Sequence, residues 1–386
     1  MPAATDMHAN EQAREQINEW IDRVNPSPIF QTMTHFTITS APAEHGVTLY
    51  TLRNAHDMRV VISDRGATLI SWWAPDRYGR EADILLGYAG SEGYLANPAY
   101  FGGVIGRWGN RIANGRFTLD GVDYQVDRNE GDNHLHGGTG GFHLMPWQVQ
   151  SDPEGLRMTL ASPHGAAGFP GNVLVSVLYR LDDDGRLCID YTATTDAPTP
   201  LNLTSHGYFN LNGGAGDICD HLLSIDADAY LQVDRRLIPE KVAKVAGSAF
   251  DFRQPAPIGP RLAWPDEQLK MAGGFDHCYC LRRENGDIAD PGRSARPLRD
   301  VATVYDPGSG RELTVSTTEN GLQFYSGNFL QGVQGRAPQA YAIHDGFCLE
   351  AQAYPDQVNT PEQEAVILRP GQVYRQTTAY RLRVRQ

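Results

Sequence analysis

Residues 201–211, with the sequence LNLTSHGYFNL, alternate between apolar and polar side chains. The odd positions are mainly apolar, with Leu201, Leu203 and Phe209 among them, whereas every even position is polar. Successive side chains of a strand point to opposite faces, so this pattern predicts a β-strand with one apolar and one polar face. The polar face contains His206 but no Lys, Asp or Glu, which suits the cleft of a polar ligand. A wet sheet face with an incidental histidine is the alternative.

A second alternating segment surrounds Glu350. One face of this predicted strand carries Cys348, Glu350, Gln352 and Tyr354, and the other carries Phe347, Leu349 and Ala351. Glu350 therefore lies in the middle of a strand, in otherwise uncharged surroundings. Burial disfavours a charged carboxylate and raises its pKa, which is how proteins tune a general base. A partner arginine could equally make this residue structural.

Short apolar runs separated by turn signals fill the chain from about residue 35 onward. Runs such as MRVVIS, LVSVLYRL and RLCIDYTAT are typical of strands, and Asn-Gly and Asp-Gly pairs recur between them. There is no repeat of fixed period and no interdomain linker. The pattern predicts one large antiparallel β domain over residues 35–386, either a sandwich or a barrel.

The N-terminal residues follow a different period. Ile17, Trp20, Ile21 and Val24 are spaced as one apolar stripe of a helix over residues 7–24. We therefore expect an N-terminal helical extension at residues 1–34, ahead of the β domain. Such a helix must dock either on the protein's own body or on a second subunit, so a homodimer is one expectation.

Composition narrows the class of partner. The 386 residues include 40 glycines, 24 prolines and 17 tyrosines, which favours strands and turns over helices. The net charge of −13 argues against a nucleic-acid or anionic-membrane partner and suits neutral ligands better than anionic ones. The five cysteines are an odd number without regular spacing, so we expect free thiols. The sequence has no membrane-length apolar run and no secretory signal, so a cytoplasmic location is expected.

Two glycine-rich stretches carry unusual polar residues. In GRWGNRIANGRF, residues 106–117, Arg111 follows Asn110, and a fixed guanidinium beside an amide suits recognition of hydroxyls or carboxylates. In NHLHGGTGGFHLMPW, residues 133–147, His134 and His136 form an H-x-H pair that could bind a metal on a strand. A surface arginine and a turn with incidental histidines are the alternatives.

Six stretches, in this order along the chain, together resemble the aldose 1-epimerase (galactose mutarotase) family between about residues 45 and 382. They are GRWGNRI, NHLHGG, NLTSHGYFNL, FDH, LQFYSGNFL and CLEAQAYPDQVN. The resemblance implies a large β-sandwich with an open cleft, no metal or other cofactor, and interconversion of the α and β anomers of free sugars. It also implies an acid/base pair formed by His206 and Glu350. The residues implied to hold the sugar are Asn110, Arg111, His136, Asp276 and Gln323.

The chain departs from the family pattern at three positions. Gly109 replaces the usual alanine, Ser205 replaces the usual asparagine before the histidine, and Lys241 interrupts the usual Pro-Thr-Gly turn. The changes at Ser205 and Lys241 could alter which sugar fits, and none of the three removes an implied catalytic group.

The implied mechanism is ring opening and closure by acid/base catalysis. Glu350 would be the base and His206, in its protonated form, the acid. Arg111 and His136 would stabilise charge near the ring oxygen, while Asp276 and Gln323 would orient the sugar.

Three other classes of protein compete with this interpretation. A metal-dependent, cupin-like enzyme would use His134, His136, Glu350 and another histidine as ligands. A carbohydrate-binding protein would keep the fold without the chemistry. A glycoside hydrolase would pair Asp276 with Glu350.

Overall fold

The structure is a computed structural model that describes residues 36–282, 297–336 and 340–386. The helix predicted at residues 7–24 lies outside the described residues.

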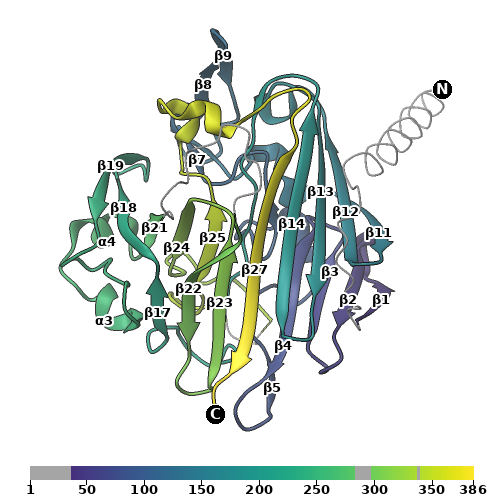
Figure 1. Ribbon diagram of the computed structural model, residues 1–386, viewed down its shortest axis with the longest axis vertical. Helices are drawn as coiled ribbons and strands as arrows, with labels where there is room; N and C mark the ends of the chain where they lie inside the picture. The colour runs from purple at the N-terminus through teal and green to yellow at the C-terminus, as the bar shows by residue number, and fades with distance from the viewer. Residues whose placement is uncertain (1–35, 283–296, 337–339) are drawn as a thin grey trace.

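The larger layer of the fold is a nine-stranded antiparallel sheet (Figure 1). The C-terminal strand lies at its centre, so the end of the chain joins strands from two distant parts of the sequence. From edge to edge, the sheet consists of β11 (Gln148–Asp152), β12 (Gly155–Ser162), β13 (Val173–Leu181), β14 (Arg186–Thr195), β27 (Tyr374–Val384), β23 (Arg311–Thr317), β22 (Arg299–Tyr305), β17 (Leu222–Ile225) and β20 (Ala256–Pro257).

Two five-stranded sheets form the other layer. The first contains, in order, β1 (Thr37–Pro42), β2 (Thr48–Arg53), β3 (Arg59–Ser63), β4 (Thr68–Pro75) and β5 (Glu81–Asp83). The second contains β19 (Pro239–Lys244), β18 (Ala227–Val233), β21 (Asp276–Leu281), β24 (Gly321–Tyr325) and β25 (Cys348–Gln352). The polar residues of the candidate site lie on the second sheet and on the loops beside it.

Short two-stranded ladders and helices complete the described fold. The ladders pair β6 (Val104–Ile105) with β16 (Thr204–Ser205), β7 (Arg111–Ile112) with β10 (His134–Leu135), β8 (Arg116–Leu119) with β9 (Val122–Gln125), and β15 (Thr199–Pro200) with β26 (Ile367–Leu368). The α-helices are α2 (Ser91–Ala96), α3 (Ile258–Leu262) and α4 (Glu267–Ala272). Of these, α4 lies beside β18 and α3 lies near β17 (Figure 1).

The two layers enclose one hydrophobic core. In β14, Leu187, Ile189 and Tyr191 are buried while their neighbours are partly exposed, as expected for a strand with one face in the core. Each such side chain contributes about 1.5–3 kcal/mol through burial. Hydrogen bonds also join the layers, because the Tyr179 hydroxyl donates to the Ala67 carbonyl and the Tyr380 hydroxyl donates to the Leu349 carbonyl. The predicted fold class, a mainly β sandwich, is confirmed.

The strand predicted at residues 201–211 is wrong in extent. Only Thr204 and Ser205 belong to a ladder. Asn202 and Phe209 make isolated bridges, to Trp108 and to Leu85 and Phe347 respectively. All of residues 201–211 are buried, so the wet-face alternative is also wrong. The polar side chains instead bind nearby backbone: Asn202 donates to the Gly109 carbonyl and accepts from the Ala353 amide.

Two other expectations concern thiols and membranes. The five cysteines are free, and Cys278 and Cys348 are buried, which confirms the expectation of free thiols. Within the described residues, no helix is long and apolar enough to cross a membrane.

Candidate active site

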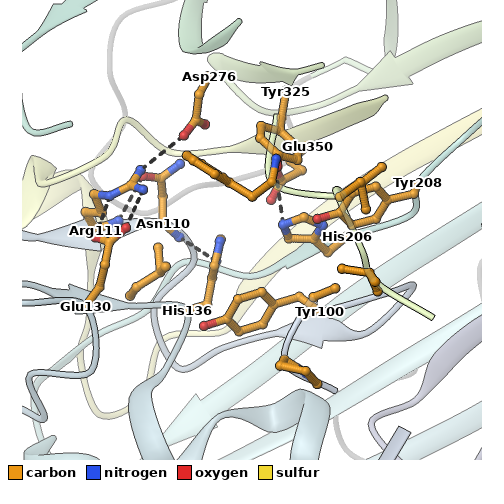
Figure 2. Close-up of a pocket in the computed structure, with 16 residues that line it drawn as sticks. Tyr100, Asn110, Arg111, Glu130, His136, His206, Tyr208, Asp276, Tyr325 and Glu350 are labelled. Atoms are coloured by element: carbon orange, nitrogen blue, oxygen red, sulfur yellow. Dashed lines mark hydrogen bonds and ion pairs between the residues drawn. The ribbon is translucent and has the colours of Figure 1, made fainter. Parts of the chain in front are cut away.

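One pocket brings together six of the seven residues that the sequence predicts for the site (Figure 2). The six are Asn110, Arg111, His136, His206, Asp276 and Glu350. They come from the loop before β7, from β7 itself, from the segments that follow β10 and β16, and from β21 and β25. Segments far apart in the sequence therefore meet at one hollow beside the second five-stranded sheet. The other lining residues are Pro98, Ala99, Tyr100, Glu130, Leu135, Tyr208, Tyr325, Phe329, Leu330 and Val333.

His206 and Glu350 face each other within this pocket. The distance from His206 Nε2 to Glu350 Oε1 is 3.7 Å, and both side chains are buried. The second carboxylate oxygen, Oε2, has no hydrogen-bond partner among the described residues. Burial raises the pKa of Glu350 well above its usual value, and the nearby charge of Asp276 adds to this effect while Arg111 opposes it. Burial lowers the pKa of His206 to about 3.

These two pKa shifts determine where a proton shared by the pair resides. Burial disfavours both the imidazolium form of His206 and the carboxylate form of Glu350, so a proton shared by the pair is held more favourably on Glu350 than on His206. That proton can reside on Glu350 or, after transfer, on His206. One site can therefore offer an acid and a base at the same moment, which is the requirement for concerted proton exchange.

Aromatic rings and a thiol hold the His206 ring in place. Tyr100 and Tyr208 stack on it at centroid distances of 5.7 and 5.1 Å. The Sγ atom of Cys348 lies 3.5 Å from Nδ1. These contacts leave Nε2 directed at Glu350.

A second polar group of the pocket consists of Glu130, Arg111 and Asp276, which we call the charged wall (Figure 2). Arg111 Nε and Nη2 donate to the two oxygens of Glu130 at 2.7 and 2.6 Å. Arg111 Nη1 lies 3.7 Å from Asp276 Oδ2. Burial alone would lower the pKa of Arg111, but Asp276 and Glu130 outweigh it and raise that pKa, so the guanidinium remains charged.

Gln323 is the predicted site residue that does not line the pocket. Its side-chain nitrogen donates to Asp276 Oδ1 at 2.7 Å, and it lies opposite Glu350 in the β24–β25 ladder. Burial raises the pKa of Asp276, while Arg111 and Gln323 oppose that rise. Gln323 therefore orients Asp276, and its direct contact with a sugar stays a prediction.

The loop carrying Asn110 and the loop carrying His136 are locked to each other. The backbone N–H of Asn110 donates to His136 Nδ1 at 3.1 Å. The backbone N–H of His136 donates to the backbone carbonyl of Asn110 at 3.2 Å. Both residues have left-handed backbones, with φ values of 66° and 52°, which is uncommon outside glycine. Gly137 follows because a Cβ there would lie 1.9 Å from the Gly106 carbonyl oxygen. The glycines of this loop thus serve close backbone packing.

The hydrogen bond to His136 also fixes its tautomer. A neutral imidazole has one proton, so a ring whose Nδ1 accepts a hydrogen bond carries that proton on Nε2. His136 therefore presents an N–H donor to the pocket, and burial keeps it neutral by lowering its pKa well below the usual value.

This tautomer bears on the metal alternative. His136, His206 and Glu350 have ligand atoms within 4.8 Å of one another. However, a protonated Nε2 has no lone pair for a metal, so His136 could coordinate one only by losing its bond to the Asn110 amide. His134 does not join this group, because it lies outside the pocket lining and its Nδ1 contacts the Asp127 carbonyl oxygen at 2.8 Å. The donor set does not fit a metal ion.

The sequence did not single out Glu130, Tyr100, Tyr208 or Tyr325 as site residues. Tyr208 and Tyr325 lie two positions after His206 and Gln323, so the alternating patterns contained a signal for both. Glu130 and Tyr100 lie in loops, where no periodicity marks which side chains face a cavity. The three departures from the family pattern, at Gly109, Ser205 and Lys241, are not among the residues that line the pocket.

Comparison with known proteins agrees with this geometry. A sequence profile of the family described as aldose 1-epimerase matches residues 48–381. The chain is 43% identical to the galactose mutarotase of Bos taurus over 330 residues, which are 85% of this chain and 92% of the relative. It is 42% identical to the aldose 1-epimerase of Escherichia coli strain K12 over 353 residues, which are 90% of this chain and 99% of the relative.

Solved structures show the same fold. A galactose 1-epimerase from Lactobacillus acidophilus superimposes with a TM-score of 0.77 at 28% identity, covering 92% of this chain and all of that one. A GalM/aldose epimerase homologue from C. elegans superimposes with a TM-score of 0.75 at 26% identity, covering 91% of this chain and all of that one.

Proposed function

Because this chain belongs to the aldose 1-epimerase family, we propose that it is an isomerase that interconverts the α and β anomers of free aldoses of the glucose and galactose type. The observation that carries the chemistry is the 3.7 Å approach of His206 Nε2 to Glu350 Oε1 at one pocket. Residues 35–386 act as one catalytic domain in this proposal, because a single core includes residues from Leu52 to Leu382.

Ring opening moves two protons while one bond breaks. The base removes the proton of the C1 hydroxyl, a C1=O double bond forms, the bond from C1 to the ring oxygen breaks, and the acid protonates the ring oxygen. Rotation about the C1–C2 bond then presents the other face of the aldehyde. Closure reverses both proton transfers and yields the other anomer.

Glu350 is the base and His206, in its protonated form, is the acid in this scheme, so the proton shared by the pair must first transfer from Glu350 to His206. The reacting oxygens are bonded to the same carbon, so an acid and a base 3.7 Å apart can each face one of them. The pair starts with one proton and ends with one proton. After opening, Glu350 holds the proton taken from the C1 hydroxyl and His206 has given its own proton to the ring oxygen. Closure reverses both transfers. Each positioned proton transfer contributes about 10²–10⁴-fold to the rate.

The charged wall holds the sugar in this proposal. Arg111 Nη1 donates to a sugar oxygen, Asp276 accepts from a hydroxyl, and Gln323 keeps Asp276 in position. His136 donates from Nε2 to an oxygen near the anomeric centre, as its fixed tautomer allows. Asn110 acts mainly through its backbone and through Oδ1, which accepts from the Arg111 amide.

Polarimetry with freshly dissolved α-D-galactose and α-D-glucose tests the proposal. The protein should accelerate the approach to the equilibrium rotation with either sugar. Binding without acceleration would indicate a carbohydrate-binding protein instead. Release of reducing sugar from a glycoside would indicate a glycoside hydrolase that uses Asp276 and Glu350.

Two expectations from the sequence, a cytoplasmic location and a homodimer, accompany this proposal. A small neutral sugar is the partner that the pocket suits. Sedimentation of the full chain would measure the number of subunits, and fractionation of cells would locate the protein.

A further inference from the structure

We propose that Glu130 is a specificity-determining residue that makes the pocket reject sugars carrying a negative charge, such as hexuronic acids. This inference rests on the proposed function, since it concerns which free sugars reach the same acid/base pair. Glu130 lies in the loop between β9 and β10 and lines the pocket.

Among the described residues that line the pocket, Arg111 is the one arginine, and Glu130 occupies the Nε and Nη2 edge of its guanidinium. The two oxygens of Glu130 accept from Arg111 Nε and Nη2 in a bidentate fork, which fixes the guanidinium plane. Only Nη1 then remains to face Asp276 and the pocket. An incoming carboxylate would normally take such a fork for itself, and here a resident carboxylate already fills it.

The charges of the lining add to this effect. Two carboxylates, Glu130 and Asp276, flank the single guanidinium of Arg111. A His206–Glu350 pair that shares one proton carries no net charge, and His136 is neutral. Two resident carboxyl groups thus lie beside one guanidinium, so the carboxylate of an anionic sugar meets a repulsion that a neutral sugar does not.

Burial makes this repulsion effective. The Arg111 side chain is 6% exposed and that of Glu130 is 34% exposed, so water screens the wall only in part. A unit charge about 6 Å away, at an effective dielectric constant of about 20, changes relative affinity about 100-fold. Partial exposure of Glu130 reduces the expected effect to about 10-fold.

The test compares D-galactose with D-galacturonate, which differ by a carboxylate and share the ring that opens. Polarimetry gives kcat/KM for each sugar in the wild-type protein and in Glu130→Gln and Glu130→Asp. Glutamine keeps the size of the side chain and removes its charge, so the galacturonate-to-galactose ratio should rise about 10-fold. Aspartate keeps the charge and should leave that ratio near the wild-type value.

A matched control removes a similar fork elsewhere. Asp120 accepts from Arg369 Nη1 and Nη2 at 2.9 and 3.0 Å on the protein surface, outside the pocket lining. Asp120→Asn should change neither the rate with galactose nor the ratio. A second measurement needs no variant: added salt should raise the wild-type galacturonate-to-galactose ratio, because salt screens repulsion.

The outcomes separate this inference from the proposed function. A wild-type protein that does not accelerate galactose mutarotation would refute the proposed function. Normal galactose activity together with an unchanged ratio in Glu130→Gln would refute the role of Glu130 alone. Equal losses for both sugars in that variant would mean that Glu130 only positions Arg111, and would also overturn the inference. If Glu130→Gln does not fold, the wild-type protein still gives a test. A galacturonate-to-galactose ratio that does not change with salt concentration would also overturn the inference.

Discussion

The charged wall and the His206–Glu350 pair line the same pocket, yet their hydrogen bonding is opposite (Figure 2). Glu130 has both oxygens in a fork with Arg111, whereas Glu350 has one oxygen without a partner and the other 3.7 Å from an imidazole. The same residue type is thereby a fixed anion in one region and a carboxyl with a raised pKa in the other. A carboxylate whose two oxygens both accept hydrogen bonds from an arginine can bind or repel ligands. A carboxyl group with an oxygen that lacks a hydrogen-bond partner can exchange a proton.

The largest predicted effect on the mutarotation rate comes from substitutions in the His206–Glu350 pair. Glu350→Gln and His206→Asn should each lower the mutarotation rate by at least about 100-fold, because each removes one positioned proton transfer. Thermal stability of Glu350→Gln should be unchanged or higher, since a buried carboxyl without partners is replaced by a neutral amide. Polarimetry and thermal melts measure the two effects. Near-normal rates in both folded variants would refute the assignment.

A smaller effect is expected at the charged wall. Arg111→Lys keeps the charge but loses the fork to Glu130, and hydrogen bonds to charged groups contribute about 1.5–3 kcal/mol. We expect kcat/KM to fall about 10- to 100-fold, with most of the change in KM because the wall binds rather than reacts. Steady-state polarimetry over a range of sugar concentrations separates the two constants. A fall confined to kcat would place Arg111 among the reacting groups instead.

The buried histidines predict how the stability of the folded protein depends on pH. Burial lowers the pKa of six histidines, to about 4 or 3 where a value is resolved: His134, His136, His143, His206, His221 and His277. An unfolded histidine binds its proton near pH 6.5, so the stability from these neutral rings is present above that pH and is lost as pH falls toward about 4.

We therefore expect the melting temperature to fall by at least about 5 °C between pH 7.5 and pH 5. Melts of His206→Asn should show a shallower fall, because one of the six groups is removed. A melting temperature that is constant over this range would contradict a dominant contribution of these rings to the pH dependence of stability.

The smallest predicted effect is that of metal removal. His136 carries its proton on Nε2, so the donors around Glu350 do not form a metal site. Dialysis against EDTA should leave the mutarotation rate within about 2-fold of the untreated protein, well below the 100-fold scale of the acid/base pair. Loss of activity that zinc restores would contradict this tautomer assignment.

Much of the fold and part of the site can be read from alternation along the chain. The pattern around Glu350 corresponds to β25, and burial of its middle residue follows from that position. The pattern around His206 predicts the burial of the apolar residues but overstates the strand, because Asn202 and Asn210 bind neighbouring backbone instead of lying on an open face.

Glu130 and the role of Gln323 could not be predicted from the sequence. The loop of Glu130 has no period that indicates direction, and its fork with Arg111 depends on a fold that joins residues 19 positions apart. Gln323 has the expected strand position, but only the ladder between β21 and β24 shows that its amide reaches Asp276. Contacts set by tertiary structure thus decide which polar residues meet the ligand.

The most direct test of the central claim is a crystal structure of Glu350→Gln, inactive in our account, with bound galactose. We predict that the C1 hydroxyl lies within hydrogen-bond distance of the residue 350 side chain and that the ring oxygen faces His206 Nε2. A sugar bound with its anomeric carbon toward Glu130 and Asp276, away from His206, would contradict the claim.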